Sequence, residues 1–255
     1  MRLHPATAAL VLGLLGPLVP DARSEVAMSA GTEHFAWSED TSPFRVKESG
    51  LRFALGLDLT QQKAIGLRFA YRGKLYAGEV GYNGAYLFAQ TVPARGNAVY
   101  TGTRQQGQAR YTLGPGLDAL GALEIDLWRR RLGTTQTEDY RVISVRLGAE
   151  HGATELERWR LGAGLKVPIW AREDAHLTRL GFDQNPILEP GRVVSPYLEL
   201  GYRVSPRWTI AGYWDGFQFS RSNRESLTRD GVEQGFLFQP ASDLRNIGLT
   251  LERKL

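Results

Sequence analysis

LRFALGLDL, residues 51–59, alternates apolar side chains with small or charged ones at every position. The odd positions hold only leucine and phenylalanine, and Arg52 and Asp58 stand among the even positions. Successive side chains of a β-strand point to opposite faces of its sheet, so this segment predicts a strand with one apolar and one polar face. Residues 65–71 repeat the pattern. The sequence therefore predicts an all-β protein whose sheet meets an apolar environment on one side.

Ten segments of the chain share this alternation and are predicted as strands. They span residues 44–59, 63–72, 75–88, 99–113, 117–130, 139–150, 156–169, 193–204, 207–220 and 236–254. Short turn sequences alternate with longer segments between them, except that residues 60–62 are short where a long loop is expected. An even number of strands with short turns at one end and long loops at the other is typical of transmembrane barrels. We predict a single closed, antiparallel, up-and-down transmembrane β-barrel of about ten strands, with eight and twelve strands as alternatives.

The start of the chain has the pattern of a secretory signal. Arg2 is followed by an apolar run at residues 8–19 and by small residues at Ala22 and Ser24. That run is shorter than the about 20 residues that a membrane-spanning helix needs. We therefore predict a cleaved signal peptide at 1–24, a periplasmic N-terminal lead at 25–43 and the barrel at 44–255.

The composition excludes several classes of function. The chain has no cysteine, which rules out disulfides and thiol chemistry, and its formal net charge is only +4. Its charges are interleaved with apolar residues rather than clustered, so nucleic-acid binding is not expected. His34, His151 and His176 lack the spacing of metal ligands. We predict no metal and no cofactor.

The polar face of the predicted sheet carries many charges, and hairpin register places several opposite one another. The predicted pairs are Arg68 with Glu79, Arg104 with Asp126, and Glu124 with Arg146. The same face also carries Arg52, Asp58, Arg110, Arg160, Lys166, Glu199 and Asp215. A ten-strand barrel is only slightly wider than the barrels that side chains can fill. These residues are therefore predicted to form a salt-bridged lumen, either filled or leaving a narrow path that would favour small anionic solutes.

The opposite face is predicted to contact lipid. Its members are Tyr76, Val80, Tyr82, Tyr86, Trp159, Leu161, Ala163, Leu165, Val167, Ile169, Leu198, Leu200, Tyr202, Trp208, Ile210, Trp214, Ile247, Leu249 and Leu251. Tyrosine and tryptophan near strand ends fit the aromatic belts at membrane interfaces. The alternative is a soluble lipocalin-like barrel or sandwich, in which this face would be the core and the charged face would meet water.

With its predicted signal, its alternating strands and the apolar segment at residues 246–251, the chain resembles a Gram-negative outer-membrane β-barrel. Gly248 and Leu251 resemble the C-terminal element used by the barrel-insertion machinery, although Leu255 stands where an aromatic residue is usual. The resemblance implies an outer-membrane location, contact with outer-membrane lipid and lipopolysaccharide, and a monomer. The predicted function is an integral outer-membrane protein, either structural or a narrow solute channel.

Two further functions on the same barrel remain alternatives. Omptin proteases are similar in strand number and in an Asp-x-His pair, which Asp174 and His176 match, but residues 88–99 hold no acidic partner. The His-x-Ser-Asn element of lipid A deacylases is also missing, because Ser222 lacks the preceding histidine. We assign no catalytic residue and do not expect an enzyme. A surface adhesin would use the loops at 171–192 and 221–235.

Overall fold

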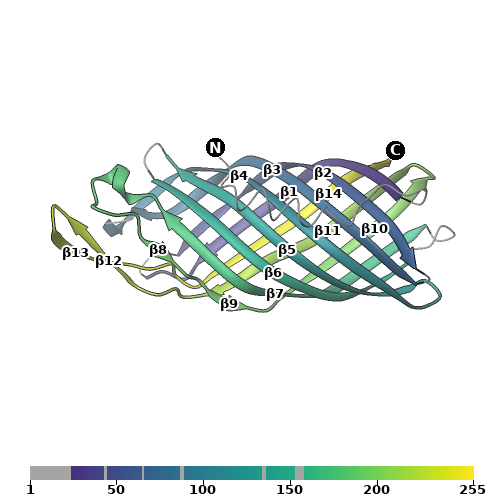
Figure 1. Ribbon diagram of the computed structural model, residues 1–255. Coiled ribbons are helices and arrows are strands. Elements are labelled where there is room, and N and C mark those ends of the chain that lie inside the picture. The colour runs from purple at the N-terminus through teal and green to yellow at the C-terminus, as the bar shows by residue number, and fades with distance from the viewer. Residues whose placement is uncertain (1–23, 43–44, 65, 87–88, 134–135, 153–157) are drawn as a thin grey trace.

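The computed structural model describes residues 24–42, 45–64, 66–86, 89–133, 136–152 and 158–255, and the predicted signal peptide lies outside them apart from Ser24. Ten long strands form a closed antiparallel barrel (Figure 1). They are β1 (Ser24–Glu39), β2 (Val46–Ala64), β3 (Leu67–Tyr86), β4 (Ala89–Gly114), β5 (Leu117–Leu132), β6 (Gln136–His151), β7 (Trp159–Ala175), β10 (Ser195–Ser205), β11 (Trp208–Ser220) and β14 (Ser242–Lys254). Pairing of β14 with β1 closes the barrel, which confirms the predicted fold class.

The remaining elements lie at the end of the barrel opposite the C-terminus (Figure 1). They are the 3-10 helix η1 (Leu177–Leu180) and the short strands β8 (Ile187–Leu188), β9 (Gly191–Val193), β12 (Glu225–Arg229) and β13 (Val232–Leu237). The β12–β13 hairpin forms a separate two-stranded sheet that projects beyond the barrel. It packs on η1 through a small core of Leu177, Phe182 and Leu227. None of the helices in the described ranges is long and apolar enough to cross a membrane.

The N-terminal third of the chain corrects two predictions. One missed a strand and the other divided one strand into two, so the predicted total of ten strands is unchanged. The predicted lead at 25–43 is mostly a barrel strand, β1. The predicted strands at 63–72 and 75–88 are one continuous strand, β3, in which Gly73 pairs with Leu57 and Gln105 instead of making a turn. Arg72 and Lys74 resemble turn residues locally, but both reach carboxylates on other strands. Residues 60–62 lie within β2, so the short loop that broke the alternation does not exist.

Side-chain direction follows strand parity around the wall. The odd residues of β2 face outward, where Phe53 is 71% exposed, while Arg52 faces the lumen and is buried. The predicted outward positions on β7, β10, β11 and β14 include the exposed residues Trp159, Leu161, Leu165, Ile169, Leu198, Leu200, Trp208, Ile210, Trp214, Ile247, Leu249 and Leu251. The apolar face is therefore the exterior, and the soluble alternative with the faces reversed is wrong.

One strand was assigned to the wrong face. Tyr76 and Val80 were predicted to meet lipid, but both point into the lumen and are buried. Because β3 continues through Gly73, their parity is that of Arg68 and Arg72, which also face inward. Tyr82 shares this parity and is half-buried, and the side chain of Tyr86 lies outside the described residues.

Candidate functional site: the filled lumen

Aromatic side chains fill the lumen near the end of the barrel that carries η1 and the β12–β13 hairpin. The rings of Trp128 and Tyr140 stack with centroids 4.9 Å apart, and Trp37 meets Tyr140 edge-on at 5.4 Å. Phe217 packs against Trp128 from the other side of the lumen, at 6.0 Å. Tyr100, on β4, is fully buried in the same cluster. Strands β1, β4, β5, β6 and β11 thus send rings to a common centre, which produces a packed layer across this part of the barrel.

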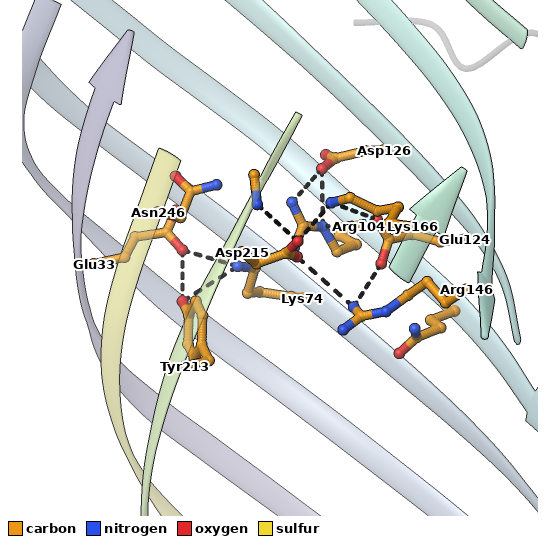
Figure 2. Close-up of polar contacts among 12 residues, drawn as sticks. Glu33, Lys74, Arg104, Glu124, Asp126, Arg146, Lys166, Tyr213, Asp215 and Asn246 are labelled. Atoms are coloured by element: carbon orange, nitrogen blue, oxygen red, sulfur yellow. Dashed lines mark hydrogen bonds and ion pairs between the residues drawn. The ribbon is translucent and has the colours of Figure 1, made fainter. Parts of the chain in front are cut away.

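A network of ion pairs lies next to this layer, at the middle of the barrel (Figure 2). Lys166 has no solvent exposure, and its Nζ lies 2.7 Å from Asp215 and 3.4 Å from Glu124. Arg104 donates to Asp126 at 2.6 Å and also contacts Asp215. Lys166 Nζ also lies 3.6 Å from the centre of the Phe217 ring. The charged network therefore rests directly on the aromatic layer.

The same network continues through residues that the sequence did not single out. Glu33 on β1 accepts from Lys74 at 2.8 Å and from the Tyr213 hydroxyl at 2.6 Å (Figure 2). It also pairs with Arg52. Arg52 donates in turn to Asn246 at 2.7 Å. Glu33 was missed because β1 was predicted to be a lead outside the barrel. Glu33, Phe35 and Trp37 lie two residues apart and so share one face of a strand, a spacing that would have indicated β1.

A second buried cluster lies nearer the end that carries η1 and is dominated by acids. Arg130 lies 2.7 Å from Glu138 and 3.5 Å from Glu39, and it donates through Nε to Glu48 at 2.9 Å. A fourth carboxylate, Glu173, is buried on the neighbouring strand, and its Oε2 has no hydrogen-bond partner among the described residues. One guanidinium thus serves several carboxylates in a site closed to water.

A cavity of about 120 Å³ lies in the lumen between the central network and the end of the barrel where β1 begins and β14 ends. Asp58, Arg72, Arg160, Glu199 and Glu252 line it and are each only partly exposed. Arg72 lies 3.2 Å from Asp58 and 2.7 Å from Glu199, so charged side chains that line the cavity form ion pairs with one another. The arrangement is a charged vestibule that ends at the ion-pair network.

The structure places most of the predicted lumen residues inside the barrel. Arg104 pairs with Asp126 in register, and Arg146 lies 2.9 Å from Glu124 although its direct strand partner is Ala122. The remaining inward residues are Arg52, Asp58, Arg68, Arg110, Arg160, Lys166, Glu199 and Asp215.

Glu79 is the exception. It lies on the exposed outer face, where it accepts from Asn97, and Arg68 pairs with Asp118 instead. Without a turn at Gly73, Arg68 and Glu79 lie eleven positions apart on one strand and so point to opposite faces.

The Asp-x-His sequence does not assemble a site within the barrel. His176 Nε2 lies 2.9 Å from Asp139, which also binds Arg129 at 2.7 Å, and this group sits on the outward wall. Asp174 faces Arg141 at 4.0 Å. Each carboxylate is thus engaged by an arginine. Among the described residues, no group of three or more histidines and acids could hold a metal ion.

No protein-family model matches the sequence, and no curated protein is significantly similar to it. Solved structures are similar in fold. The outer-membrane protease OmpT of Escherichia coli is 10% identical, with 92% of this chain and 97% of that chain covered and a TM-score of 0.51. The translocator domain of the autotransporter NalP from Neisseria meningitidis is 9% identical over 96% of this chain and 94% of that chain, with a TM-score of 0.40. The attachment invasion locus protein Ail of Yersinia pestis is 12% identical over 91% and 99%, with a TM-score of 0.36.

The likeness to OmpT concerns the fold, and it agrees with the closed wall, the apolar exterior and the charged interior described above. The chain therefore has the fold of a Gram-negative outer-membrane β-barrel.

Proposed function

We propose that this chain is an integral outer-membrane protein with a sealed lumen, a structural component of the envelope that presents its outer loops at the cell surface. The observation that carries this proposal is the complete burial of Lys166 and Glu124 beside an equally buried aromatic layer. Water and ions would have to displace packed rings and paired charges to cross, and an unpaired buried charge is costly. This supports the structural reading over the narrow channel.

Planar-bilayer recording of the refolded protein tests the proposal. We expect no single-channel current above the leak of the lipid, whereas an outer-membrane porin recorded in the same bilayers as a control should conduct. Heat-modifiable migration in SDS gels would first establish that the inserted protein is folded. A steady, ion-selective current from folded protein would refute the sealed lumen and favour the channel.

Membrane fractionation tests the location separately. The protein should sediment with outer-membrane vesicles and resist extraction with urea. Recovery in the periplasmic fraction would contradict an integral outer-membrane role, whatever the conductance.

The adhesin alternative has one observation in its favour, and the hydrolase alternative has none. An adhesin reading is supported by the β12–β13 hairpin, where Val232 and Phe236 are exposed on a projecting element. For the hydrolase reading, Asp174 and His176 lie on the outward wall and are engaged by Arg141 and Asp139. No geometry in the described part of the chain favours hydrolysis.

A further inference from the structure

A second, smaller cavity lies in the lumen beside the charged vestibule. Its volume is about 10 Å³, and its lining includes Gln106 on β4, Arg146 and Glu150 on β6, and Tyr197 on β10. Gln106 and Arg146 also line the vestibule, so the two cavities adjoin. A single water molecule needs about 10–15 Å³ open to its centre and about two to four polar partners. The inner cavity therefore has the size of one water molecule.

Each of these four side chains has one buried polar atom left over. Among the described residues, no hydrogen-bond partner is found for Gln106 Nε2, Arg146 Nε, Glu150 Oε1 or Tyr197 Oη. The four residues are only 2–4% exposed, so bulk solvent does not satisfy these atoms. A buried polar atom without a partner is costly. Four such atoms on the residues that line one cavity indicate a partner that they share.

The two charged members are fixed by ion pairs that leave one atom of each free. The terminal nitrogens of Arg146 lie 2.9 Å from Glu124 and 3.1 Å from Glu199, which leaves its Nε–H as a donor. Glu150 pairs through Oε2 with Arg110 at 3.3 Å, which leaves Oε1 as an acceptor. Both leftover atoms are therefore held in place by contacts made elsewhere.

A chain of hydrogen bonds decides which atom of the Gln106 amide is left over. Arg110 can only donate, and it donates to Gln108 Oε1 at 2.9 Å. Gln108 therefore donates through its own Nε2 to Gln106 Oε1, at 2.5 Å. The remaining atom of the Gln106 amide is Nε2, which is a donor.

The hydroxyl of Tyr197 is positioned by packing. Its ring lies under the guanidinium of Arg146, whose central carbon is 3.8 Å from the ring centre. Its Oη lies against Gly148 and Gly164, where an added Cβ would come within 2.3 and 2.7 Å of it. Glycine at these two positions thus makes room for the hydroxyl.

The four leftover atoms match the hydrogen-bonding capacity of one water molecule. Arg146 Nε–H and the Gln106 amide can donate to the two lone pairs of the water. Glu150 Oε1 and the hydroxyl oxygen of Tyr197 can accept its two hydrogens. An anion would meet the carboxylate of Glu150, and a cation would meet the two donors. The site therefore favours a small neutral ligand that donates and accepts equally.

We propose that the inner cavity binds one water molecule, held by the four leftover atoms as a fixed part of the lumen. The water enters from the vestibule, with which the cavity shares Gln106 and Arg146. This goes beyond a sealed lumen, because water then penetrates past Arg146 from the end where β1 begins, while the aromatic layer stays dry.

X-ray hydroxyl-radical footprinting of the refolded protein tests the site, because radicals formed from a bound water oxidise a ring beside it. Mass spectrometry of the wild type should show oxidation of Tyr197, although its side chain is buried. Tyr100, which is buried in the aromatic layer, should remain unmodified and serves as the internal reference. Oxidation of Tyr197 no greater than that of Tyr100 would refute the water site.

Gly162 allows the cavity to be filled without a clash. It lines the cavity, and an added Cβ would meet its nearest atoms at 3.7 and 3.9 Å, which is ordinary van der Waals contact. Gly162→Ala should keep its heat-modifiable migration but lose the oxidation of Tyr197, because the methyl group takes the place of the water. Unchanged oxidation of Tyr197 in the folded variant would contradict the proposal.

The matched control is Gly201→Ala on β10. Gly201 lines neither cavity, and its added Cβ would meet its neighbours at 3.4 and 3.5 Å. This variant should show the wild-type oxidation of Tyr197. An equal loss in both variants would mean that any added methyl group in the lumen abolishes the signal, and would overturn the assignment to the inner cavity.

Two further comparisons identify the ligand and its place. Replacing chloride in the buffer with gluconate should leave the oxidation of Tyr197 unchanged, whereas an increase would show chloride in the site and overturn the assignment to water. Tyr213 lines the vestibule and should be oxidised equally in the wild type and in Gly162→Ala. Loss at Tyr213 as well as at Tyr197 would refute a distinct inner site. None of these measurements depends on conductance, so the water site and the sealed lumen can fail separately.

Discussion

Arg130 shows how much of this barrel depends on single side chains. It is buried and lies within ion-pair distance of Glu39, Glu48 and Glu138, which come from β1, β2 and β6. Its guanidinium also lies 5.5 Å from the centre of the Trp37 ring, so it joins the acidic cluster to the aromatic layer. Arginine suits this position because its planar group can bind several carboxylates at once and stays charged when buried.

Replacing Arg130 should be strongly destabilising. Arg130→Gln leaves three buried carboxylates without their cation, and breaking a buried pair in this way costs about 3–5 kcal/mol. The free energy of unfolding, from urea titration of the protein in lipid vesicles, measures the effect. Arg245→Gln removes an exposed arginine that pairs with Asp243 and should cost under about 1 kcal/mol. Equal costs for the two variants would mean that the buried cluster is not held by this cation.

At the level of single strands, the two faces of β7 have different neighbours. Leu165 is exposed on the outer wall, and the next residue, Lys166, is completely buried in the lumen. One step along the chain thus passes from the apolar exterior to the ion-pair network. The alternation is interrupted at Ile169, where a β-bulge shifts parity so that Glu173 still points inward.

A charge introduced on the outer face of β7 should destabilise the folded barrel, because that face contacts hydrocarbon. Leu165→Arg is expected to cost about 2–4 kcal/mol if Leu165 lies near the membrane midplane. Gln218→Arg, on the outward face of β11 near the outer loops, should cost about 0–1 kcal/mol, because that end lies near the interface. Unfolding titrations in the same vesicles compare the two. A larger loss of unfolding free energy for Gln218→Arg than for Leu165→Arg would contradict the assignment of Leu165 to the middle of the apolar belt and of Gln218 to the interface.

For the whole molecule, closure depends on the first strand. β1 pairs along its length with β14 on one side and with β2 on the other. It also supplies Glu33 to the central network and Phe35 and Trp37 to the aromatic layer. β1 therefore completes both the wall of the barrel, by pairing with β14, and the packing of side chains inside it.

Deleting residues 25–39 should prevent the barrel from forming. β2 and β14 would each lose a partner, and the network would lose Glu33, so the heat-modifiable band in SDS gels should disappear. Deleting the hairpin at 225–237, a segment of nearly equal length, should leave that band in place, because the hairpin pairs only with itself. Survival of the barrel without residues 25–39 would restore the interpretation of this segment as a lead.

Local pattern was enough to predict the class of fold and most of the outer face. The period of two along residues such as Leu51 to Leu59 is a property of each strand alone, and it separates an apolar face from a polar one. Arg104 and Asp126 could also be paired from sequence, because the short turn at Gly114 to Gly116 fixes their register. These features need only residues that lie close together in the chain.

Other features depend on contacts between strands that are distant in sequence. Gly73 between two cations has the local character of a turn, and only the partners of Arg72 and Lys74 across the barrel show that β3 continues. Whether the lumen is filled could not be read from parity, since that requires knowing which rings and charges from five or more strands meet at one level. The sequence by itself determined the two faces of most strands, because side-chain direction is local; the tertiary structure alone decided what closes the interior, because closure requires the opposite walls to meet.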